Sequence, residues 1–419
     1  MRIALLSYST RPRGGVVHTL ALAEALAALG EDVTVWSLGR GGDEEFFRPV
    51  DPAVRLRIVP FPEGPSDEGV GPRILRSIAV LRDAFAPAAA EYDVVHAQDC
   101  ISANAVMANG RCMRTVHHID HFTTPELAAC HERAIVEPYA HLCVSRAVAD
   151  DLADGWGIKA EVIPNGVAYE RFADTDPSAR AAWRDRLGRF VLTVGGIEPR
   201  KGSLDLLEAY ALLRAGHPDV SLVIAGGETL FDYRDYRTRW EARARELGVR
   251  PIVLGPVPHD DLPPLVAAAD AFVFPSVKEG FGLAAMEALA AGTPLVVRDL
   301  PVLREVFSPA ARFAADPAGL AAELRAALSV DDPARQAAGR SLAARHTWTD
   351  AARRHLDFYR VHPTAPSQSA GGEQADRQTG RAVADEIRDD RADDGDELES
   401  VARKARGHRN LRMSRMPGE

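Results

Sequence analysis

Short apolar runs alternate with helix-compatible stretches along most of this chain, and that alternation limits its fold more than any other feature. The runs that predict β-strands are rich in Val, Ile and Leu, and several lack the polar alternation of a half-exposed strand. Such runs favour parallel sheets that helices cover on both faces. In chain order they are RIALLSYS, DVTVWSL, LRIVPF, DVVHAQ, RTVHHI, HLCVS, AEVIPNG, FVLTVGG, SLVIAGG, PIVLGPV, AFVFPS and PLVVR.

The two halves of the chain repeat one pattern. Each opens with an apolar strand, a loop that holds Gly and Arg, and then a helix: RIALLSYSTRPRGGVVHTLALAEALAALG first, and FVLTVGGIEPRKGSLDLLEAYALL second. At 419 residues the chain also exceeds the size at which a single core usually stops growing. We therefore expect an α/β protein with two Rossmann-like, doubly wound parallel-sheet domains that face a cleft. In such sheets ligands bind beyond the carboxyl ends of the strands.

The composition changes abruptly near the end of the chain. From Pro363 onward there is no Phe, Trp or Tyr, and an acidic block at 385–399 precedes a basic stretch at 403–415. Such a segment cannot bury enough apolar surface to fold alone, so we expect a disordered tail. The predicted division is a first Rossmann-like domain at 1–168, a linker at 169–189, a second Rossmann-like domain at 190–345, a helical segment at 346–362 and the tail at 363–419.

The overall composition is that of an ordinary soluble globular protein, with 46% hydrophobic and 26% charged residues. A net charge of −10 argues against a nucleic-acid-binding surface over the whole protein, so we expect no nucleic-acid partner. The four cysteines form no C-x-x-C pair and no disulfide framework, which indicates reduced thiols. The sequence shows neither a signal peptide nor an apolar run long enough to span a membrane, so we expect a cytoplasmic location.

The segment VKEGFGLAAMEALAAGTPLVV at 277–297 carries the strongest functional signal. Gly280 and Gly282 follow the AFVFPS run, and an Ala-rich helix begins after them. Glycines let a backbone approach a ligand closely, and a helix N-terminus attracts phosphate oxygens. Glu279 and Glu287 follow an E-x7-E spacing, and their carboxylates are suited to accept hydrogen bonds from hydroxyl groups of a ligand. One diphosphate and two sets of hydroxyls describe a nucleotide sugar, although a packing role for both glutamates stays open.

Two adjacent cations stand in the corresponding loop of the second half. Arg200 and Lys201, the latter one of only four lysines, follow the FVLTVGG run and precede Gly202 and a helix. Two cations at a helix start repel the helix dipole unless an anion lies among them. Arg binds phosphate oxygens with its planar guanidinium, and Lys offers a compact charge. The pair therefore fits a diphosphate leaving group, whose negative charge grows as it departs. A solvated basic loop is the alternative, and the nearby Gly195 and Gly196 argue against it.

A second loop of this kind follows the first strand, where Arg11, Arg13, Gly14 and Gly15 precede a helix. It predicts another anion-facing loop, but it lacks G-x-G-x-x-G, so a dinucleotide fingerprint is not supported. There is also no P-loop, and outside the tail no D-x-D follows a strand to hold a divalent metal on a diphosphate. Neutralising the phosphate charge would then depend on basic side chains and helix N-termini.

Three histidines, His117, His118 and His121, follow the RTV run. Their H-H-x-x-H spacing invites a metal interpretation, but no cysteine or carboxylate set completes a site, so we expect no metal. A histidine at the end of a parallel strand is better suited to contact a polar substrate. We expect His118 and His121 at the surface or in supporting positions. Because adjacent strand residues face opposite ways, the choice between His117 and His118 stays open.

Taken together, these motifs resemble the GT-B glycosyltransferases of the large retaining family 4 type, over about residues 1–360. The last matching motif, with its E-x7-E pair, is the most specific, and HTWTDAARRHLDFY at 346–359 resembles the family's final helix, which crosses back onto the N-terminal domain. The motifs agree in order through RPRGGVVHTLALAEALAALGEDV, RTVHHIDHF, VIPNGV, TVGGIEPRKG, LVIAGGE, LGPVPHDDLPPLVAAADAFVFPS and EGFGLAAMEALAAGTP.

The resemblance implies an acceptor-side N-terminal domain and a C-terminal domain that binds the sugar nucleotide. It puts Arg200 and Lys201 on the diphosphate, Glu279 near the donor sugar, Glu287 at the ribose and His117 facing the transferred sugar. The implied catalytic residues are His117, Arg200, Lys201 and Glu279. The implied donor-binding residues are Gly15, Gly196, Arg200, Lys201, Glu279, Gly280, Phe281, Gly282, Leu283 and Glu287.

The implied reaction moves a hexose from a nucleotide-diphosphate sugar to a hydroxyl acceptor, with retention of anomeric configuration and without a metal or other cofactor. A GT-B phosphorylase or epimerase, or a non-catalytic sugar-nucleotide-binding protein, are the alternatives. The acceptor, a small molecule or a lipid-linked one, is not identified by the sequence. The segment GPRILRSIAVLRDAF at 71–85 sets three arginines beside an apolar stripe, which would allow peripheral contact with the inner membrane face. An ordinary domain helix is the favoured interpretation there.

Overall fold

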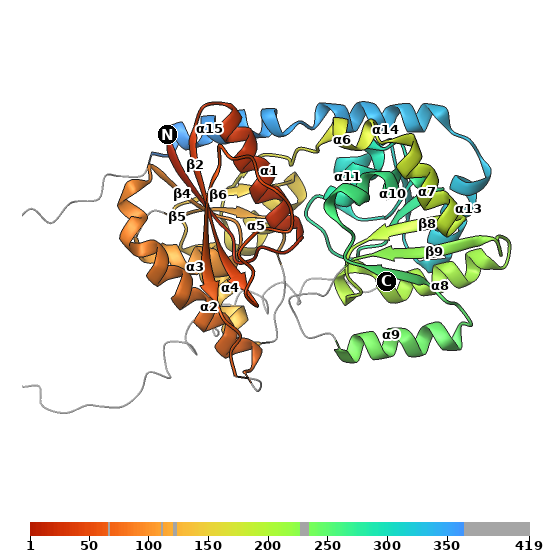
Figure 1. Cartoon of the computed structure of the whole chain (residues 1–419), viewed down its shortest axis with the longest axis horizontal. Helices are drawn as coiled ribbons and strands as arrows, with labels where there is room; N and C mark the ends of the chain where they lie inside the picture. Colours follow the sequence, from red (N-terminus) through yellow and green to blue (C-terminus); the bar gives the residue numbers. More distant parts are fainter. Residues whose placement is uncertain (66–67, 110–111, 120–123, 227–233, 364–419) are drawn as a thin grey trace, which may run out of the picture. The chain divides into compact units, whose positions relative to one another are not determined.

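The computed structural model describes residues 1–65, 68–109, 112–119, 124–226 and 234–363 of the chain, which leaves His121 and the predicted tail from residue 364 onward outside it. Within these ranges the chain forms two parallel β-sheets (Figure 1). The first has the strand order β3-β2-β1-β4-β5-β6-β7, and the second has the order β10-β9-β8-β11-β12-β13. The predicted fold class, two parallel-sheet α/β domains, is confirmed.

The first sheet is buried between two layers of helices, as its continuous apolar strands predict. Helices α2 and α3 pack on one face, and α1 packs on the other together with the last helix of the chain. The strands are β1 (Arg2–Leu6), β2 (Asp32–Arg40), β3 (Arg55–Phe61), β4 (Val94–Ala97), β5 (Cys112–Val116), β6 (Ala140–Cys143) and β7 (Glu161–Val162). The helices are α1 (Gly14–Ala28), α2 (Val70–Phe85), α3 (Cys100–Val106), α4 (Pro125–Val136) and α5 (Arg146–Trp156), with 3₁₀ turns η1 (Ala86–Glu91) and η2 (Met107–Asn109).

The second sheet is likewise covered on both faces. Its strands are β8 (Arg189–Val194), β9 (Val220–Ala225), β10 (Ile252–Gly255), β11 (Ala271–Phe274), β12 (Leu295–Arg298) and β13 (Arg312–Ala314). The helices from α6 onward are α6 (Tyr169–Ala173), α7 (Pro177–Leu187), α8 (Ser203–Arg214), α9 (Arg234–Glu246), α10 (Leu262–Ala268), α11 (Leu283–Ala290), α12 (Pro301–Phe307), α13 (Pro317–Ser329), α14 (Pro333–Arg345) and α15 (Trp348–Val361), with 3₁₀ turns η3 (Pro199–Lys201) and η4 (His259–Asp261). The predicted linker at 169–189 thus contains α6 and α7, and β13 is a strand that the sequence analysis missed.

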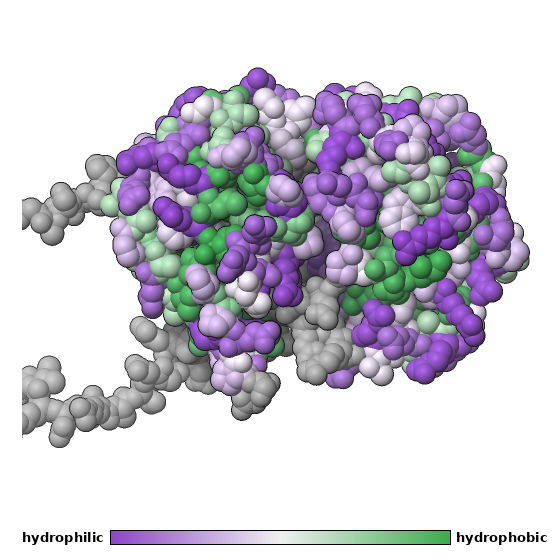
Figure 2. Space-filling model, viewed as in Figure 1, coloured by the Kyte–Doolittle hydropathy of each residue, from purple (hydrophilic) through white to green (hydrophobic). Residues whose placement is uncertain are grey.

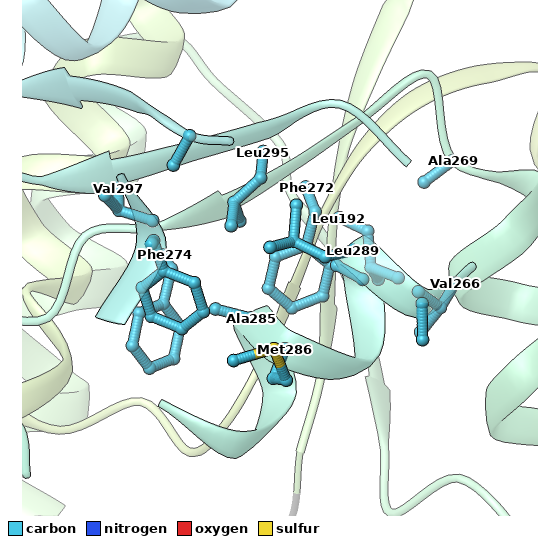
Figure 3. Packing of buried hydrophobic residues seen from close by; sticks show 14 of the residues in the cluster. Leu192, Val266, Ala269, Phe272, Phe274, Ala285, Met286, Leu289, Leu295 and Val297 are labelled. Carbon is cyan, nitrogen blue, oxygen red and sulfur yellow. The ribbon is translucent and has the colours of Figure 1, made fainter. Parts of the chain in front are cut away.

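Helix α11 is fixed to the second sheet by tightly packed apolar side chains (Figure 3). Met286 and Leu289 from α11 lie against Leu192 of β8 and against Phe272 and Phe274 of β11, and all five are at most 3% exposed. Burying each such side chain stabilises the fold by about 1.5–3 kcal/mol. The N-terminus of α11 therefore has a fixed place at the carboxyl edge of this sheet.

Helix α15 packs beside α1 on the first sheet (Figure 1). Leu356 lies in the apolar cluster of that sheet, and the Tyr359 hydroxyl is 2.8 Å from Nδ1 of His96 on β4. The last described helix therefore contributes to the core of the first sheet, although β8–β13 and α8–α14 intervene in the chain.

The face drawn in Figure 2 is mainly hydrophilic, with smaller hydrophobic areas between the polar ones. The apolar stripe of α2 is internal, since Ile74, Leu81 and Phe85 are at most 4% exposed. This burial favours the ordinary domain helix over a membrane-facing one. None of the helices in the described ranges is both long enough and apolar enough to span a membrane.

The strand order reverses at β1/β4 in the first sheet and at β8/β11 in the second. In open α/β sheets, ligands bind in the crevice at such a point, outside the carboxyl ends of the strands. The loops after β1, β4, β8 and β11 are therefore the places to look for a site.

Candidate functional site

The loop after β8 has a backbone that only glycine accommodates easily. Gly195 has φ +149° and Gly202 has φ +63°, on either side of the turn η3. A Cβ on Gly202 would lie 2.2 Å from the carbonyl oxygen of Pro275, which follows β11. The close approach of these two loops sets Lys201 and Arg200 next to the β11 loop.

Both cations are paired with carboxylates of the chain itself. Lys201 Nζ is 2.5 Å from Glu279 Oε1, and Arg200 Nη1 is 3.2 Å from the same oxygen. Arg200 Nη2 also lies 3.0 Å from Glu198 Oε1. The negative charge that two adjacent cations require is therefore supplied by Glu279 and Glu198. Two positive charges face two negative ones.

Glu279 is an ionised carboxylate in this environment. Burial raises its pKa, but the nearby charges of Lys201 and Arg200, with the Lys201 hydrogen bond, outweigh burial and lower the pKa to about 2. His118 adds a smaller effect in the same direction, so this histidine also lies near Glu279. A carboxylate held by two cations is a weak nucleophile and a good means of orienting them.

The turn that carries Glu279 is shaped by glycine at two further positions. A Cβ on Gly280 would lie 1.6 Å from the carbonyl oxygen of His117, so no side chain fits there. Gly282, with φ +96°, precedes α11, and Phe281 between the two glycines is 3% exposed. The turn therefore brings the main chain of His117 against the start of α11, which begins at Leu283.

Glu287, eight residues after Glu279, lies on α11 with a carboxylate of different character. Burial raises its pKa to about 7, and the charge of Arg171 lowers the pKa only in part. A half-buried carboxylate that is not tightly paired is suited to accept hydrogen bonds from hydroxyl groups of a ligand. The E-x7-E pair thus contains one paired glutamate and one that titrates near neutral pH.

A recess of about 300 Å³, which includes space open to solvent, lies beside these groups. Lys201, Gly195 and Gly196 line it from the β8 loop, and Phe274 and Ser276 line it from the end of β11. The Lys201 ammonium also lies 5.0 Å from the centre of the Phe274 ring. A compact cation at a glycine-lined recess is an arrangement that phosphate oxygens fit.

The structure distinguishes the two adjacent histidines. β5 ends at Val116, so His117 and His118 follow the strand and the alternation of strand side chains does not apply to them. The ring of His117 lies against Gly15, 3.8 Å from where a Cβ would be, and its Nε2 donates to Gln98 Oε1 over 3.2 Å. Burial lowers the His117 pKa to about 3, so the ring is neutral.

Sequence reasoning missed several residues that position the predicted ones. Gln98 follows β4, and His18 on α1 stacks edge-on against His117 at 4.7 Å between ring centres. Arg298, at the end of β12, is 6% exposed and donates to the carbonyl oxygens of Pro275 and Ala315. A basic residue directly after the apolar run PLVV was the available signal for Arg298.

No metal-binding group stands out in the part of the chain that the structure describes: no three His, Cys, Asp or Glu side chains are placed to hold an ion there. The four cysteines are free, and Cys112, Cys130 and Cys143 are buried, as reduced thiols would be.

Comparison with known proteins defines the class. Residues 12–171 match glycosyltransferase family 4, and residues 182–341 match glycosyl transferases group 1. The chain therefore belongs to the GT-B glycosyltransferases of the family 4 type and is a transferase enzyme, as the resemblance implied. The GT-B fold is confirmed by solved structures as well.

Two relatives and one structure illustrate the match. The chain is 29% identical over 398 residues to the phosphatidyl-myo-inositol mannosyltransferase of Mycobacterium leprae, covering 88% of this chain and 99% of that protein. It is 31% identical over 390 residues to a glycogen synthase of Mycobacterium tuberculosis, covering 83% of this chain and 90% of that protein. The fold superposes on Anabaena HepE in complex with UDP-glucose with a TM-score of 0.68, at 20% identity, covering 86% of this chain and 100% of that one.

Proposed function

We propose that the protein transfers a hexose from a nucleotide-diphosphate sugar to a hydroxyl acceptor, with retention of anomeric configuration and without a metal. The ion pairs of Lys201 and Arg200 with Glu279, together with the glycine-lined recess that Lys201 borders, carry this proposal. Two cations there can neutralise the charge that develops on a departing diphosphate. The UDP-glucose bound to HepE, a protein of the same fold, supports a nucleotide-sugar donor.

We assign the roles of the site residues from the family resemblance, and their geometry supports the assignment. Arg200 and Lys201 bind the diphosphate, and Glu279 holds the two cations while it faces the donor sugar. Glu287 accepts hydrogen bonds from the ribose hydroxyls, because it is half-buried and not tightly paired. His117 is neutral, and with Nε2 donating to Gln98 its Nδ1 is free to accept from a sugar hydroxyl.

Positioning does most of the catalytic work in this proposal. The negative charge of Glu279 is compensated by its ion pairs with Lys201 and Arg200, so we assign this residue no nucleophilic role. The acceptor hydroxyl attacks on the face that the diphosphate leaves, and the departing phosphate oxygen takes the hydroxyl proton. Orientation of this kind can lower the activation barrier by about 7–11 kcal/mol, and charge stabilisation lowers the barrier further. The fixed glycine turns at Gly202 and Gly280 provide that orientation.

A panel of UDP-, GDP- and ADP-hexoses, with EDTA present, tests the proposal. We expect one donor class to raise the melting temperature and to release its nucleotide slowly, and NMR of the product to show the donor's anomeric configuration. Dependence on an added divalent metal would contradict the metal-free site, and inversion would contradict retention. Release that requires inorganic phosphate instead of a hydroxyl acceptor would indicate a phosphorylase. Stabilisation by a donor without turnover under any condition would indicate a binding protein.

A further inference from the structure

Two arginines lie over the ring of Tyr8 at the carboxyl edge of the first sheet, and the charge of a third, Arg73, acts on one of them, Arg40. Arg13 precedes α1, Arg40 ends β2 and Arg73 lies in the first turn of α2. The Arg13 and Arg40 guanidinium carbons are 5.7 Å and 5.3 Å from the centre of the Tyr8 ring. We call Tyr8, Arg13, Arg40 and Arg73 the Tyr8 cluster.

The backbone and a serine hold Arg40 in place within this cluster. Its Nη2 donates to the Ser77 hydroxyl over 2.9 Å, and its Nε is 3.4 Å from the Tyr8 carbonyl oxygen. Neither partner carries a negative charge. The guanidinium is thus oriented by neutral groups, which leaves its charge without compensation from them.

The positive charges of the Tyr8 cluster also lack carboxylate partners. In the ranges that the structure describes, no carboxylate lies within ion-pair distance of Arg13, Arg40 or Arg73, and the buried Nε of Arg13 has no hydrogen-bond acceptor. Burial, together with the charges of Arg73 and Arg13, lowers the pKa of Arg40 to about 10, although Tyr8 and Asp99 act in the opposite direction, so these cations lie near one another.

The nearby buried acid Asp99 compensates these charges only in part, since its charge raises the pKa of Arg40. Asp99 accepts hydrogen bonds from the backbone N–H groups of Tyr8 and Ser102, at 3.0 Å and 2.7 Å. Burial raises the pKa of Asp99, and these hydrogen bonds offset the rise in part, so its carboxylate is engaged mainly by the main chain. By contrast, Arg76, one helical turn after Arg73, forms a two-point ion pair with Glu68 at 2.7 Å for both contacts. Glu68 is thus engaged by Arg76, and the charges of Arg73 and Arg40 act on it without forming an ion pair in the described ranges.

Like charges held together and partly removed from water are costly unless an anion joins them. Guanidinium groups from three elements present planar donor pairs, and phosphoryl oxygens are the anion that such donors bind with two hydrogen bonds at a time. We propose that the acceptor carries a phosphoryl group and that the Tyr8 cluster binds it. This inference rests on the proposed glycosyl transfer, because it names the acceptor for that site.

The place of the Tyr8 cluster fits an acceptor subsite. Arg13 is two residues from Gly15, which lies against the His117 ring. His117 in turn lies against Gly280 at the start of the α11 turn. A phosphoryl group at the Tyr8 cluster would hold the rest of the acceptor beside the transferred sugar, with a hydroxyl group toward it.

Binding of inorganic phosphate and glycerol phosphate, with glycerol as the uncharged control, tests the proposal by calorimetry. The full chain with Lys201→Ala is the background, because that substitution removes a second phosphate-suited cation. We expect saturable phosphate binding that Arg13→Gln or Arg73→Gln weakens by about tenfold or more, since charged hydrogen bonds of this kind are lost. Arg82→Gln, on the same helix and paired with Asp83, is the matched control and should bind like the background.

Two outcomes would overturn the inference: no phosphate binding in the background protein, or equal binding in Arg73→Gln and Arg82→Gln. Circular dichroism and melting temperature show whether each variant is folded. If one of the Arg13 and Arg73 variants does not fold, the other still tests the proposal. Donor-induced stabilisation of the wild type is measured separately. If a donor binds and phosphate does not, this inference fails alone; if no nucleotide sugar binds or turns over, the proposed function fails.

Activity separates the two sources of such a phosphoryl group. With the donor found above, transfer is compared on myo-inositol 1-phosphate, on myo-inositol and on phosphatidylcholine vesicles with and without phosphatidylinositol. Transfer to the soluble phosphate identifies a free acceptor, and transfer only to the phosphatidylinositol vesicles identifies a lipid headgroup. Arg73→Gln should raise the KM for the phosphorylated acceptor about tenfold or more with a smaller change in kcat. A preference for the phosphate-free polyol would contradict the proposal.

Discussion

At the scale of single residues, the two glutamates of the E-x7-E pair differ through their neighbours. Glu279 is held by Lys201 and Arg200, which keep its pKa at about 2, whereas for Glu287 the charge of Arg171 offsets burial only in part. Identical side chains eight residues apart therefore do different work. One fixes the cations, and the other offers an acceptor whose charge depends on pH.

Replacing Lys201 by Met should lower kcat about 100-fold or more, because one of the two charges that stabilise the leaving diphosphate is lost. Glu279 keeps Arg200 as a partner in this variant, so the melting temperature should change little. Steady-state kinetics with the identified donor measure the effect. Lys159→Met, at an exposed position, is the control. Turnover within twofold of wild type in the Lys201 variant would remove this residue from the site.

Donor affinity should depend on pH through Glu287. Below a pKa of about 7 the carboxyl is protonated and accepts hydrogen bonds poorly, so affinity should rise as the pH goes from about 6 to 8 and then level off. Titration of the nucleotide at several pH values measures this. Glu287→Gln should flatten the profile, and Glu170→Gln, at an exposed position, should leave the profile as it is. A profile unchanged by the Glu287 substitution would show that another group titrates.

At the scale of elements, the site is made by loops at the carboxyl edges of strands that the sheet topology sets side by side. β8 and β11 are neighbours in the second sheet, although 76 residues lie between Val194 and Ala271 in the chain. The contact between Gly202 and the Pro275 carbonyl follows from that pairing. The positions of Lys201 and Glu279 thus depend on two loops that fit together.

The sequence predicts the elements better than it predicts their contacts. Apolar runs and glycine loops mark most strands and the α11 turn, because burial and backbone conformation are local properties. The sequence analysis missed β13, because a strand of three residues, Arg312–Ala314, is too short to show a recognisable apolar pattern. The Lys201–Glu279 pair and the Gln98–His117 hydrogen bond join residues that neighbouring strands bring together, and local patterns carry no information about such pairs.

Gly202→Ala separates backbone strain from steric conflict at this junction. Gly202 and Gly248 have nearly the same φ, +63° and +64°, but a Cβ on Gly248 meets open space. Gly248→Ala should therefore cost only the left-handed strain, about 1–2 kcal/mol of unfolding free energy, with turnover near wild type. Gly202→Ala must also displace Pro275, so turnover should fall about tenfold or more. Equal kinetics in the two variants would show that the loop contact does not position Lys201.

At the scale of the whole described chain, buried histidines connect the last helix to the site. His355 on α15 lies 6.1 Å from His18 and 5.9 Å from His96 between ring centres, and His18 lies 4.7 Å from His117. Burial lowers the pKa of all four, to about 3 for His117 and about 4 for His355. Neutral histidines therefore form the contact between α15, the first sheet and the site.

This arrangement predicts acid lability with a definite sign. The unfolded chain binds a proton at each histidine below pH 6.5, whereas in the folded chain His117 and His355 bind one only at about pH 3–4, so stability is intact above pH 6.5 and falls as the pH drops through that window. Each buried histidine contributes a slope of about 1.4 kcal/mol per pH unit. Urea unfolding at pH 7, 6 and 5 measures the total, and His355→Gln should reduce the slope by about that amount. His217→Gln, in the turn after α8 and outside this histidine contact, is the control. If His355→Gln left the slope unchanged, the protons would be taken up elsewhere and α15 would not be the acid-sensitive contact.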